Sequence, residues 1–391
     1  MEYIRRTLEI EDMLEESSLF LFGPRMTGKT SYIENELQKK AILSITFLDG
    51  DTLDAFRRNP VLLRSMLNGK TEGFVIVDEV QLFPPVLLDV QHIMTHSDIQ
   101  FLLTGSSARK LKKSGSNLLG GRAGIVSMHP LVWKEVKDRN PELDSIFAAG
   151  MLPKAFMARS YQTQLRNYVR GYLDNEIAAE GERRDLGAFS NFLTFAASEN
   201  TELMNFSNVS RDIGMSADTI KEWYQILVDT FIGYYLRPYR KGSKRIPVNT
   251  SKFYFFDVGV ARAAARMPVP SETMTEYGKM FENYIFMELK AYIDYRMTDD
   301  ELYFWRTREG YEVDFVIENK VAIEVKTAKS ITNKELKGLR AFMDENAVKD
   351  YIIVCRELFE RTTDDGIRIM PWKAFLDRLW NGEIIQQSQT R

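Results

Sequence analysis

The chain has 391 residues, a formal net charge of −3, 44% hydrophobic residues and 27% charged residues. This balance is typical of a globular protein with sizeable cores, and it excludes a disordered or fibrous chain. The slightly acidic charge excludes a basic field over the whole molecule. Contact with nucleic acid would therefore need a local basic patch.

Length favours about two to three domains. The single cysteine, Cys355, lies in the apolar run YIIVC, which predicts a buried thiol in a reducing compartment. The N-terminus lacks the apolar stretch of a signal peptide, and the other apolar runs are too short to cross a bilayer. We therefore expect a cytoplasmic protein that does not contact a membrane.

The stretch SLFLFGPRMTGKTS, residues 18 to 31, is an apolar run followed by the phosphate-loop pattern G-x-x-x-x-G-K-T. The pattern predicts a strand, a loop whose backbone N–H groups face the phosphates of a nucleotide, and a helix that starts at Lys29. Lys29 is expected to neutralise phosphate charge, and the Thr30 hydroxyl to bind Mg²⁺. The flanking strand and helix disfavour the alternative, a fortuitous glycine-rich turn. The predicted nucleotide-binding residues are Gly23, Pro24, Arg25, Met26, Thr27, Gly28, Lys29, Thr30 and, from a later strand, Thr104.

Two further strand patterns end in residues that suit the same site. In GFVIVDEVQ, apolar residues lead to Asp78 and Glu79 at the carboxyl end of a strand, where open α/β sheets bind ligands. Asp78 is predicted to hold Mg²⁺ through a water, and Glu79 to orient or deprotonate the attacking water. In IQFLLTGSS, the hydroxyls of Thr104 and Ser106 could sense a γ-phosphate. The alternation of strands and helices predicts a parallel sheet, and hence an α/β P-loop domain over residues 1–150.

Arg122 follows two glycines in NLLGGRAG, on what reads as a flexible turn. Such an arginine could stabilise a γ-phosphate as an arginine finger, either within its own subunit or in a neighbouring one. Action in a neighbouring subunit would make the protein a homo-oligomer. The alternative is an ordinary surface arginine beside a loop.

A helical segment and a helix-turn-helix are predicted for residues 151–265. From Phe147 to about Ser198, apolar residues recur at helical spacing, and Asp174, Glu176 and Glu180 are expected on a solvated helix face. In residues 205 to 230, Ser207 is expected to cap a helix that stops at Gly214, and Ser216 to cap the next helix.

Two strand-like runs, FIGYYLRPY and KFYFFDVG, follow these helices and predict a winged-helix shape. The turn between the runs is rich in basic residues, which suits contact with a DNA backbone. The mixed charge of the second helix suits docking to protein instead, and both partners stay open. The basic residues are Arg237, Arg240, Lys241, Lys244 and Arg245.

Residues 266–391 read as helix, three strands, helix and strand, which is the core order of the restriction-endonuclease-like, or PD-(D/E)XK, fold. In EVDFVIENKVAIEVK, a three-residue hairpin loop would place Asp314 opposite Glu324, with Lys326 on the same face. Two facing carboxylates can hold Mg²⁺ and a lysine can activate water, with Glu282 as a third carboxylate. The alternative is a half-exposed hairpin with cross-strand ion pairs.

The chain resembles archaeal and bacterial AAA-type ATPases with an uncharacterised, endonuclease-like C-terminal domain. The resemblance is carried by GPRMTGKT, IVDEVQ, LLTGSS, LLGGR, FSNVSRDIGMSADTIKEWYQIL, KFYFFDVG, FENYIFMEL, EVDFVIE and AIEVK. The resemblance spans about residues 1 to 355. It implies ATP binding at the phosphate loop, Asp78 and Glu79 as the acidic pair, and nuclease-like positions at Asp314, Glu324 and Lys326. We therefore expect an Mg²⁺-dependent ATPase that acts as a nucleotide-dependent switch on or near DNA. The rival hypotheses are an ATP-gated nuclease and a signalling or scaffold ATPase whose C-terminal domain binds protein.

Overall fold

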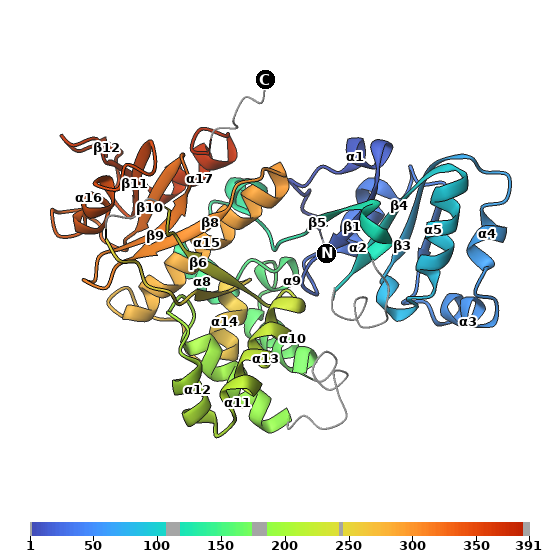
Figure 1. The fold of residues 1–391 in the computed structure, drawn as a ribbon, viewed down its shortest axis with the longest axis horizontal. Coiled ribbons are helices and arrows are strands. Elements are labelled where there is room, and N and C mark those ends of the chain that lie inside the picture. Colours follow the sequence, from blue (N-terminus) through green and yellow to red (C-terminus); the bar gives the residue numbers. More distant parts are fainter. Residues whose placement is uncertain (1, 107–117, 174–185, 242–244, 386–391) are drawn as a thin grey trace. The chain divides into compact units, whose positions relative to one another are not determined.

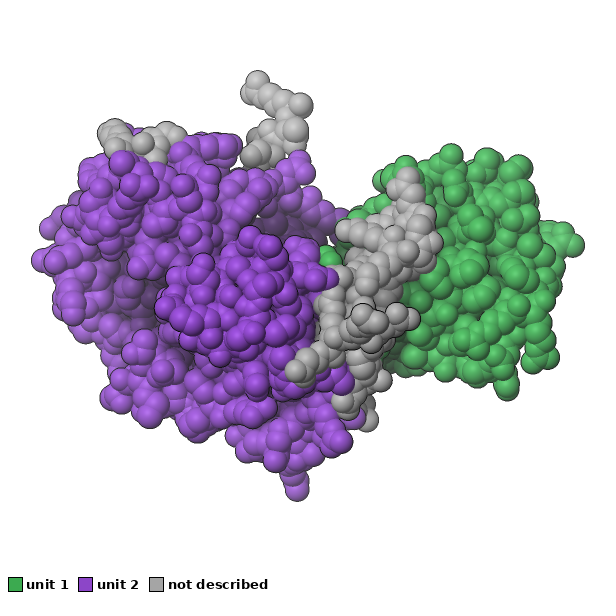
Figure 2. All heavy atoms as spheres, turned by 60° about the horizontal axis from the view of Figure 1, so that its bottom comes forward, with its two compact units in different colours: residues 1–131, 229–231 green, residues 132–228, 232–391 purple. Residues whose placement is uncertain are grey.

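The computed structural model describes residues 2–106, 118–173, 186–241 and 245–385 (Figure 1). The predictions for Asp174, Glu176, Glu180 and Lys244 concern residues outside these ranges. Two compact units are distinguished in Figure 2: residues 1–131 with 229–231, and residues 132–228 with 232–391. The division into domains at 150 and 265 stays a prediction. Within the described ranges, no helix is both long and apolar enough to span a membrane.

The described part of the first unit is built on a five-stranded parallel sheet, as the alternating pattern predicted. The strand order is β2-β3-β4-β1-β5. Because β4 pairs with both β1 and β3, the carboxyl ends of these three strands lie side by side. The strands are β1 (Ser18–Phe22), β2 (Leu43–Thr46), β3 (Glu72–Asp78), β4 (Asp98–Gly105) and β5 (Ala123–Ser127).

Helices connect these strands, and buried aliphatic and aromatic side chains form the core around the sheet. The helices are α1 (Glu11–Glu16), α2 (Lys29–Tyr32), the π-helix η1 (Ile33–Leu37), α3 (Gly50–Arg58), α4 (Leu62–Met66) and α5 (Val86–His96), with the short 3-10 helices η2 (Val80–Leu82) and η3 (Leu118–Gly121). Strand β5 was not predicted, because its segment reads as a glycine-rich turn.

The second unit begins with helices, as the helical spacing after Phe147 predicted. Their apolar faces meet in one core of buried aromatic and aliphatic residues, and Figure 1 shows α10 to α14 gathered together. The helices are α7 (Trp133–Val136), η4 (Lys137–Arg139), α8 (Leu143–Ala149), α9 (Pro153–Phe156), α10 (Tyr161–Tyr172), α11 (Leu186–Ser198), α12 (Phe206–Ile213), α13 (Ala217–Asp229) and α14 (Val258–Ala264).

The predicted helix-turn-helix is present as α12 and α13. Gly214 ends α12 with a φ of 74°, and Ser216 Oγ accepts a hydrogen bond from Thr219 N at 3.1 Å, as expected of a cap. The predicted cap of α12 was wrong. Asn205, not Ser207, precedes the helix, and its side chain accepts a hydrogen bond from Asn208 N at 3.1 Å. Ser207 lies inside the first turn of α12.

The remaining strands of the second unit form, within the described residues, an eight-stranded mixed sheet in the order β12-β13-β11-β10-β9-β8-β6-β7. The predicted order of helix, three strands, helix and strand is observed as α15, β8, β9, β10, α16 and β11. The elements are β6 (Gly233–Pro238), β7 (Lys252–Phe255), α15 (Thr275–Arg296), β8 (Leu302–Arg306), β9 (Glu312–Ile317), β10 (Val321–Val325), α16 (Lys337–Met343), β11 (Asp350–Cys355), β12 (Arg361–Thr362), β13 (Arg368–Pro371) and α17 (Trp372–Trp380).

Strands β6 and β7 pair antiparallel, as a wing would. However, β6 also pairs with β8 in parallel, with Arg237 beside Tyr303. The hairpin therefore continues the C-terminal sheet, and a separate winged-helix domain is not confirmed. Cys355 is buried, as predicted.

Candidate functional site

The phosphate loop has the backbone that its glycines predict. Gly23 has a φ of 150°, and a Cβ atom there would lie 2.3 Å from the carbonyl oxygen of Met128, so only glycine fits. Gly28 has a φ of 98° and directly precedes α2, which begins at Lys29. The loop therefore leads into a helix N-terminus, which favours binding of a phosphate group.

The Lys29 ammonium is buried inside the loop. Its Nζ donates to the carbonyl oxygens of Gly23 at 2.8 Å and Pro24 at 2.9 Å. Arg6 supports the loop and was missed by the sequence analysis. Its guanidinium donates to the carbonyl oxygens of Thr27 at 2.6 Å and His129 at 2.7 Å, so it ties the loop to the segment after β5.

Asp78, at the end of β3, is a buried hub of hydroxyl contacts. Its Oδ2 accepts from Thr30 Oγ1 at 3.4 Å and from Thr46 Oγ1 at 3.3 Å. Its Oδ1 accepts from Thr104 Oγ1. The structure thus brings together Thr30, Asp78 and Thr104, which were predicted from three separate motifs. Thr46 is an additional member that the sequence analysis did not single out.

Glu79 follows in a left-handed conformation, with a φ of 57°. Its backbone N–H donates to Thr104 Oγ1 at 3.1 Å, and its carboxylate accepts from the Gln81 amide. Burial raises the pKa of Glu79, and the nearby Lys29 ammonium offsets part of that rise. A partly buried carboxylate with a raised pKa, held beside a phosphate loop, is suited to act as a general base.

Gln81 is the second side chain that the sequence analysis missed. Its Nε2 also donates to Ser106 Oγ at 3.3 Å, so it joins Glu79 to the end of β4. Its Oε1 is buried and, among the described residues, has no hydrogen-bond partner. A Cβ atom on Gly105 would lie 2.7 Å from that oxygen, so the glycine leaves room for the amide.

Arg122 lies at the amino ends of the parallel strands, opposite the carboxyl ends where Thr30, Asp78 and Thr104 meet. It precedes β5, whose first residue, Ala123, pairs with Ser18 at the start of β1. Its guanidinium donates to Thr95 Oγ1 at 3.2 Å, near the end of α5. The phosphate loop follows the opposite end of β1, about 16 Å away for a strand of this length. An arginine finger within its own subunit is therefore not supported by this geometry, and action in a neighbouring subunit stays a prediction.

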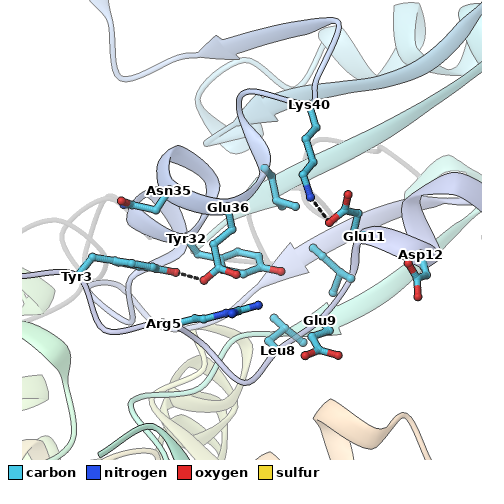
Figure 3. Close-up of a pocket in the computed structure, with 12 residues that line it drawn as sticks. Tyr3, Arg5, Leu8, Glu9, Glu11, Asp12, Tyr32, Asn35, Glu36 and Lys40 are labelled. Carbon is cyan, nitrogen blue, oxygen red and sulfur yellow. Dashed lines mark hydrogen bonds and ion pairs between the residues drawn. The ribbon is translucent and has the colours of Figure 1, made fainter.

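A cavity of about 550 Å³ lies beside the helix that continues from the phosphate loop (Figure 3). Within it, the Tyr3 hydroxyl donates to Glu36, and Lys40 pairs with Glu11. Carboxylates line much of its wall and would repel phosphate groups, so the loop is the better phosphate site. These carboxylates belong to Glu9, Glu11, Asp12 and Glu36.

In the second unit, the predicted register of the carboxylate hairpin is confirmed. Ile323 pairs with Phe315, so the next residues, Glu324 and Asp314, face each other across β9 and β10. Asp314 Oδ2 accepts from Val325 N at 2.8 Å, and Glu324 Oε2 accepts from Asp314 N at 3.3 Å. The Lys326 ammonium pairs with Glu324, as its place on the same face predicted.

Glu282 does not complete a metal site with this pair. It accepts hydrogen bonds from Lys252 Nζ at 2.9 Å and from Tyr254 Oη at 2.5 Å. In the part of the chain that the structure describes, no three histidine, cysteine or acidic side chains form a group that could hold a metal ion. The predicted metal set of Glu282, Asp314 and Glu324 is therefore not assembled.

The carboxyl groups of this cluster have shifted pKa values. Burial, with the Asp314 charge second, raises the pKa of Glu324 to about 8. Burial also raises the pKa of Glu282 to about 7, although Lys252 opposes that rise.

Most of the described basic residues of the predicted DNA-binding turn are paired with acids. The ion pairs join Arg237 to Glu301 at 2.5 Å, Lys241 to Glu318 at 2.6 Å, and Arg245 to Asp344 at 2.8 Å. Arg240 donates to the carbonyl oxygen of Asn249 at 3.1 Å. The turn therefore carries less free positive charge than its composition indicates.

Three sequence profiles match successive parts of the chain. They describe an AAA domain over residues 15–137, a domain of unknown function (DUF8612) over residues 140–271, and a second domain of unknown function (DUF4143) over residues 277–375. Residues 15–137 are thus similar in sequence to AAA domains, and we refer to them as the AAA-type domain. The phosphate loop, Asp78 and Glu79 all lie within these residues.

Several uncharacterised proteins are similar to this chain. One from Methanocaldococcus jannaschii is 25% identical over 415 residues, which cover 95% of this chain and 90% of the relative. One from Haemophilus influenzae is 22% identical over 399 residues, covering 94% and 96%. One from Mycobacterium tuberculosis is 25% identical over 309 residues, covering 77% and 67%. The first two alignments extend well beyond the AAA-type domain.

Among solved structures, the ORC2 protein of Aeropyrum pernix in its ADP form has a TM-score of 0.32 and 10% identity, over 68% of this chain and 96% of that chain. The ORC1 protein of the same organism, in complex with DNA, has a TM-score of 0.29 and 11% identity, over 68% and 94%. TM-scores this low do not establish a common overall fold, and no function follows from them.

Proposed function

We propose that the protein binds ATP with Mg²⁺, hydrolyses it slowly, and works as a nucleotide-dependent switch. The observation that carries this proposal is the set of contacts at the carboxyl ends of the strands, where Thr30 of the loop, Asp78 of β3 and Thr104 of β4 meet. Release of phosphate from ATP by the purified full-length protein, with and without Mg²⁺, tests it. Absence of both nucleotide binding and phosphate release would contradict it.

The residues of the loop fit an Mg²⁺ ion. Thr30 Oγ1 and Asp78 Oδ2 are 3.4 Å apart, and both are hard oxygen donors of the kind that Mg²⁺ prefers. These two groups would hold the ion, which neutralises charge on the β- and γ-phosphates when bound. Lys29 would exchange its two carbonyl partners for phosphate oxygens.

Glu79 would accept a proton from the attacking water, since its carboxylate is partly buried and its pKa is raised. The expected rate is slow because Arg122 lies at the amino ends of the strands, away from the phosphate loop of its own subunit. An arginine finger is worth about 10³–10⁵ in turnover. A lone subunit without one would thus resemble a switch rather than a fast ATPase.

Gln81 should act as a positioning residue in this reaction. Replacing Gln81 by methionine keeps the length of the side chain but removes the donor to Glu79 and Ser106. Gly105→Ala keeps glutamine at position 81 but pushes its side-chain amide out of position, because the new Cβ would lie 2.7 Å from Oε1. Both changes should lower kcat by about 10²-fold, the cost of misplacing a reacting group by about 1 Å, with ATP affinity unchanged.

Steady-state turnover and binding of a fluorescent ATP analogue measure this split between kcat and affinity. Gly50→Ala is the matched control, because Gly50 lies in the same unit and no atom stands within 4 Å of its added Cβ. Full turnover in Gly105→Ala would show that the Gln81 amide does not need its present position.

We also propose that the switch acts on DNA, with the exposed Arg240 and Lys241 as backbone contacts. Because Lys241 is paired with Glu318, DNA must compete with an existing ion pair, and binding should be weak and sensitive to salt. Replacing both residues by alanine should weaken binding to all sequences alike. The slope of log affinity against log salt should fall by about 2, or roughly 0.9 for each phosphate contact.

Fluorescence anisotropy with labelled duplexes at several salt concentrations, with and without ATP, measures this. Lys334→Ala with Lys337→Ala removes the same charge from exposed positions elsewhere in the second unit and serves as the control. Equal DNA affinity in all three proteins would favour the alternative in which the second unit binds a protein.

A further inference from the structure

Four acidic residues of the second unit, Glu282, Glu312, Asp314 and Glu324, form a carboxylate cluster. This cluster already contains a buried cation, Lys252. The Lys252 ammonium lies 2.9 Å from Glu282, 2.7 Å from Glu312 and 4.0 Å from Asp314. Its side chain is only 3% exposed. The three carboxylates come from α15 and β9, whereas the lysine comes from β7, so the sheet brings them together from distant parts of the sequence.

Lys252 is fixed in place by its backbone. It pairs with Leu236 across the β6–β7 hairpin and forms an isolated bridge with Leu203 on its other side. Its ammonium also lies 5.6 Å from the centre of the Phe304 ring, a cation–π distance. The position of this cation is therefore set by the sheet rather than by a loose surface side chain.

The charges around Lys252 require a cation. Asp314 and Glu324 are buried, and Glu282 and Glu312 beside them are partly exposed. Lys326 pairs with Glu324 and Arg306 with Glu312, but Glu282 and Asp314 face Lys252. Like charges so close are costly unless compensated. Burial alone would lower the pKa of Lys252, but the neighbouring carboxylates outweigh it and hold that pKa well above its usual value. The lysine is therefore held in its charged form.

We infer that Lys252 is the buried cation of this cluster, with Lys326 beside Glu324, and that it occupies the place that a divalent metal would need. A metal ion could share these carboxylates only by displacing an ammonium whose side chain is almost completely buried. The hairpin that resembles a nuclease site is thus, in this chain, a metal-free ion-pair network. Removing the charge of Lys252 should convert the network into a divalent-cation site. This inference does not depend on the proposed ATPase activity.

Thermal melts of nucleotide-free protein, with and without millimolar Mn²⁺, test the inference. The wild-type midpoint should respond to Mn²⁺ no more than the midpoint of Asp314→Asn does, because the phosphate loop is the same in both. Lys252→Met keeps the volume of the stem and removes the charge, so its midpoint should be lower and should rise again with Mn²⁺. Lys252→Met combined with Asp314→Asn should lose that response. Thr30 and Asp78 of the phosphate loop are the same in every variant, so any Mn²⁺ bound there cancels in the comparison.

Two outcomes would overturn the inference. The first is an Mn²⁺-dependent rise of the wild-type midpoint that Asp314→Asn abolishes, because a metal would then bind beside Lys252. The second is a folded Lys252→Met protein with no response to Mn²⁺. If Lys252→Met does not fold, Lys252→Met with Glu282→Gln removes one charge of each sign and leaves three carboxylates. That variant is expected to gain the Mn²⁺ response, and its failure to do so counts against the inference equally.

Discussion

Replacement of Lys29 by alanine is expected to abolish tight ATP binding, whereas replacement of Glu79 by glutamine should leave binding intact and stop turnover. The Lys29 ammonium is the buried charge inside the loop, so its loss removes the group that neutralises phosphate. Glu79→Gln keeps the shape of the side chain and its contact with Gln81, but an amide cannot accept the proton of the attacking water. Loss of a general base typically costs about 10²–10⁴-fold in rate.

Equilibrium binding of a fluorescent ATP analogue and phosphate release measured on the same preparations separate the two effects. Glu9→Gln is the matched control, because it makes the same chemical change at an exposed position of the same unit. Equal rates of phosphate release in wild type and Glu79→Gln would remove Glu79 from the mechanism. Unchanged affinity for the ATP analogue in Lys29→Ala would show that the phosphate loop is not the ATP-binding site.

The parts of the site that could be predicted from the sequence are those fixed by local chemistry. The spacing of Gly23 and Gly28 determines a loop and a helix start within a single stretch, and the structure has both. The register of the carboxylate hairpin was also predictable, because alternation fixes the faces and a three-residue loop fixes the pairing of Asp314 with Glu324. In each case the residues involved are near one another in the sequence.

The parts that could not be predicted depend on packing between distant segments. Lys252 reaches Asp314 only because β7 joins the same sheet, and nothing in the local pattern of either strand indicates that contact. Arg122 was placed near the phosphates because β5 was read as a turn. Because β5 pairs in parallel with β1, Arg122 lies at the end of the strands opposite the phosphate loop. The acids that pair with the basic turn come from still more distant elements, such as Glu318 and Asp344.

The same kind of long-range contact produces the largest expected effect on stability. Asp257 is fully buried in the second unit and caps α14 by accepting from Val260 N at 2.8 Å. Its other oxygen accepts from Met151 N at 2.6 Å, which ties α14 to the segment after α8. Gly150 lies directly against it, with a φ of 69°, and an added Cβ would be 2.2 Å from Asp257 Oδ1.

Gly150→Ala should therefore lower the free energy of unfolding by about 3–5 kcal/mol, combining backbone strain with overpacking against Asp257. Urea unfolding followed by circular dichroism measures this. Gly366→Ala is the control that separates the two causes, because Gly366 also has a positive φ, of 87°, but has open space around it. It should cost only the strain, about 1–2 kcal/mol. Equal losses at the two positions would show that the contact with Asp257 contributes nothing.

Asp257 should also make stability depend on pH. Burial raises its pKa to about 6, although four backbone N–H groups oppose that rise. In the unfolded chain the pKa returns to about 3.9. Between these values the folded protein retains a proton that the unfolded chain has released. Stability from this group therefore falls as pH rises from about 4 to 6, by about 1.4 kcal/mol per unit, and is constant above 6.

Asp257→Asn cannot titrate, so the difference in unfolding free energy between wild type and variant should be larger at pH 4.5 than at pH 7. Urea titrations of both proteins across this range measure that difference, and because the other titrating groups are common to both, their contributions cancel. A difference that grows with pH instead would mean that the backbone donors outweigh burial. The cap of α14 would then be held by an ionised carboxylate throughout.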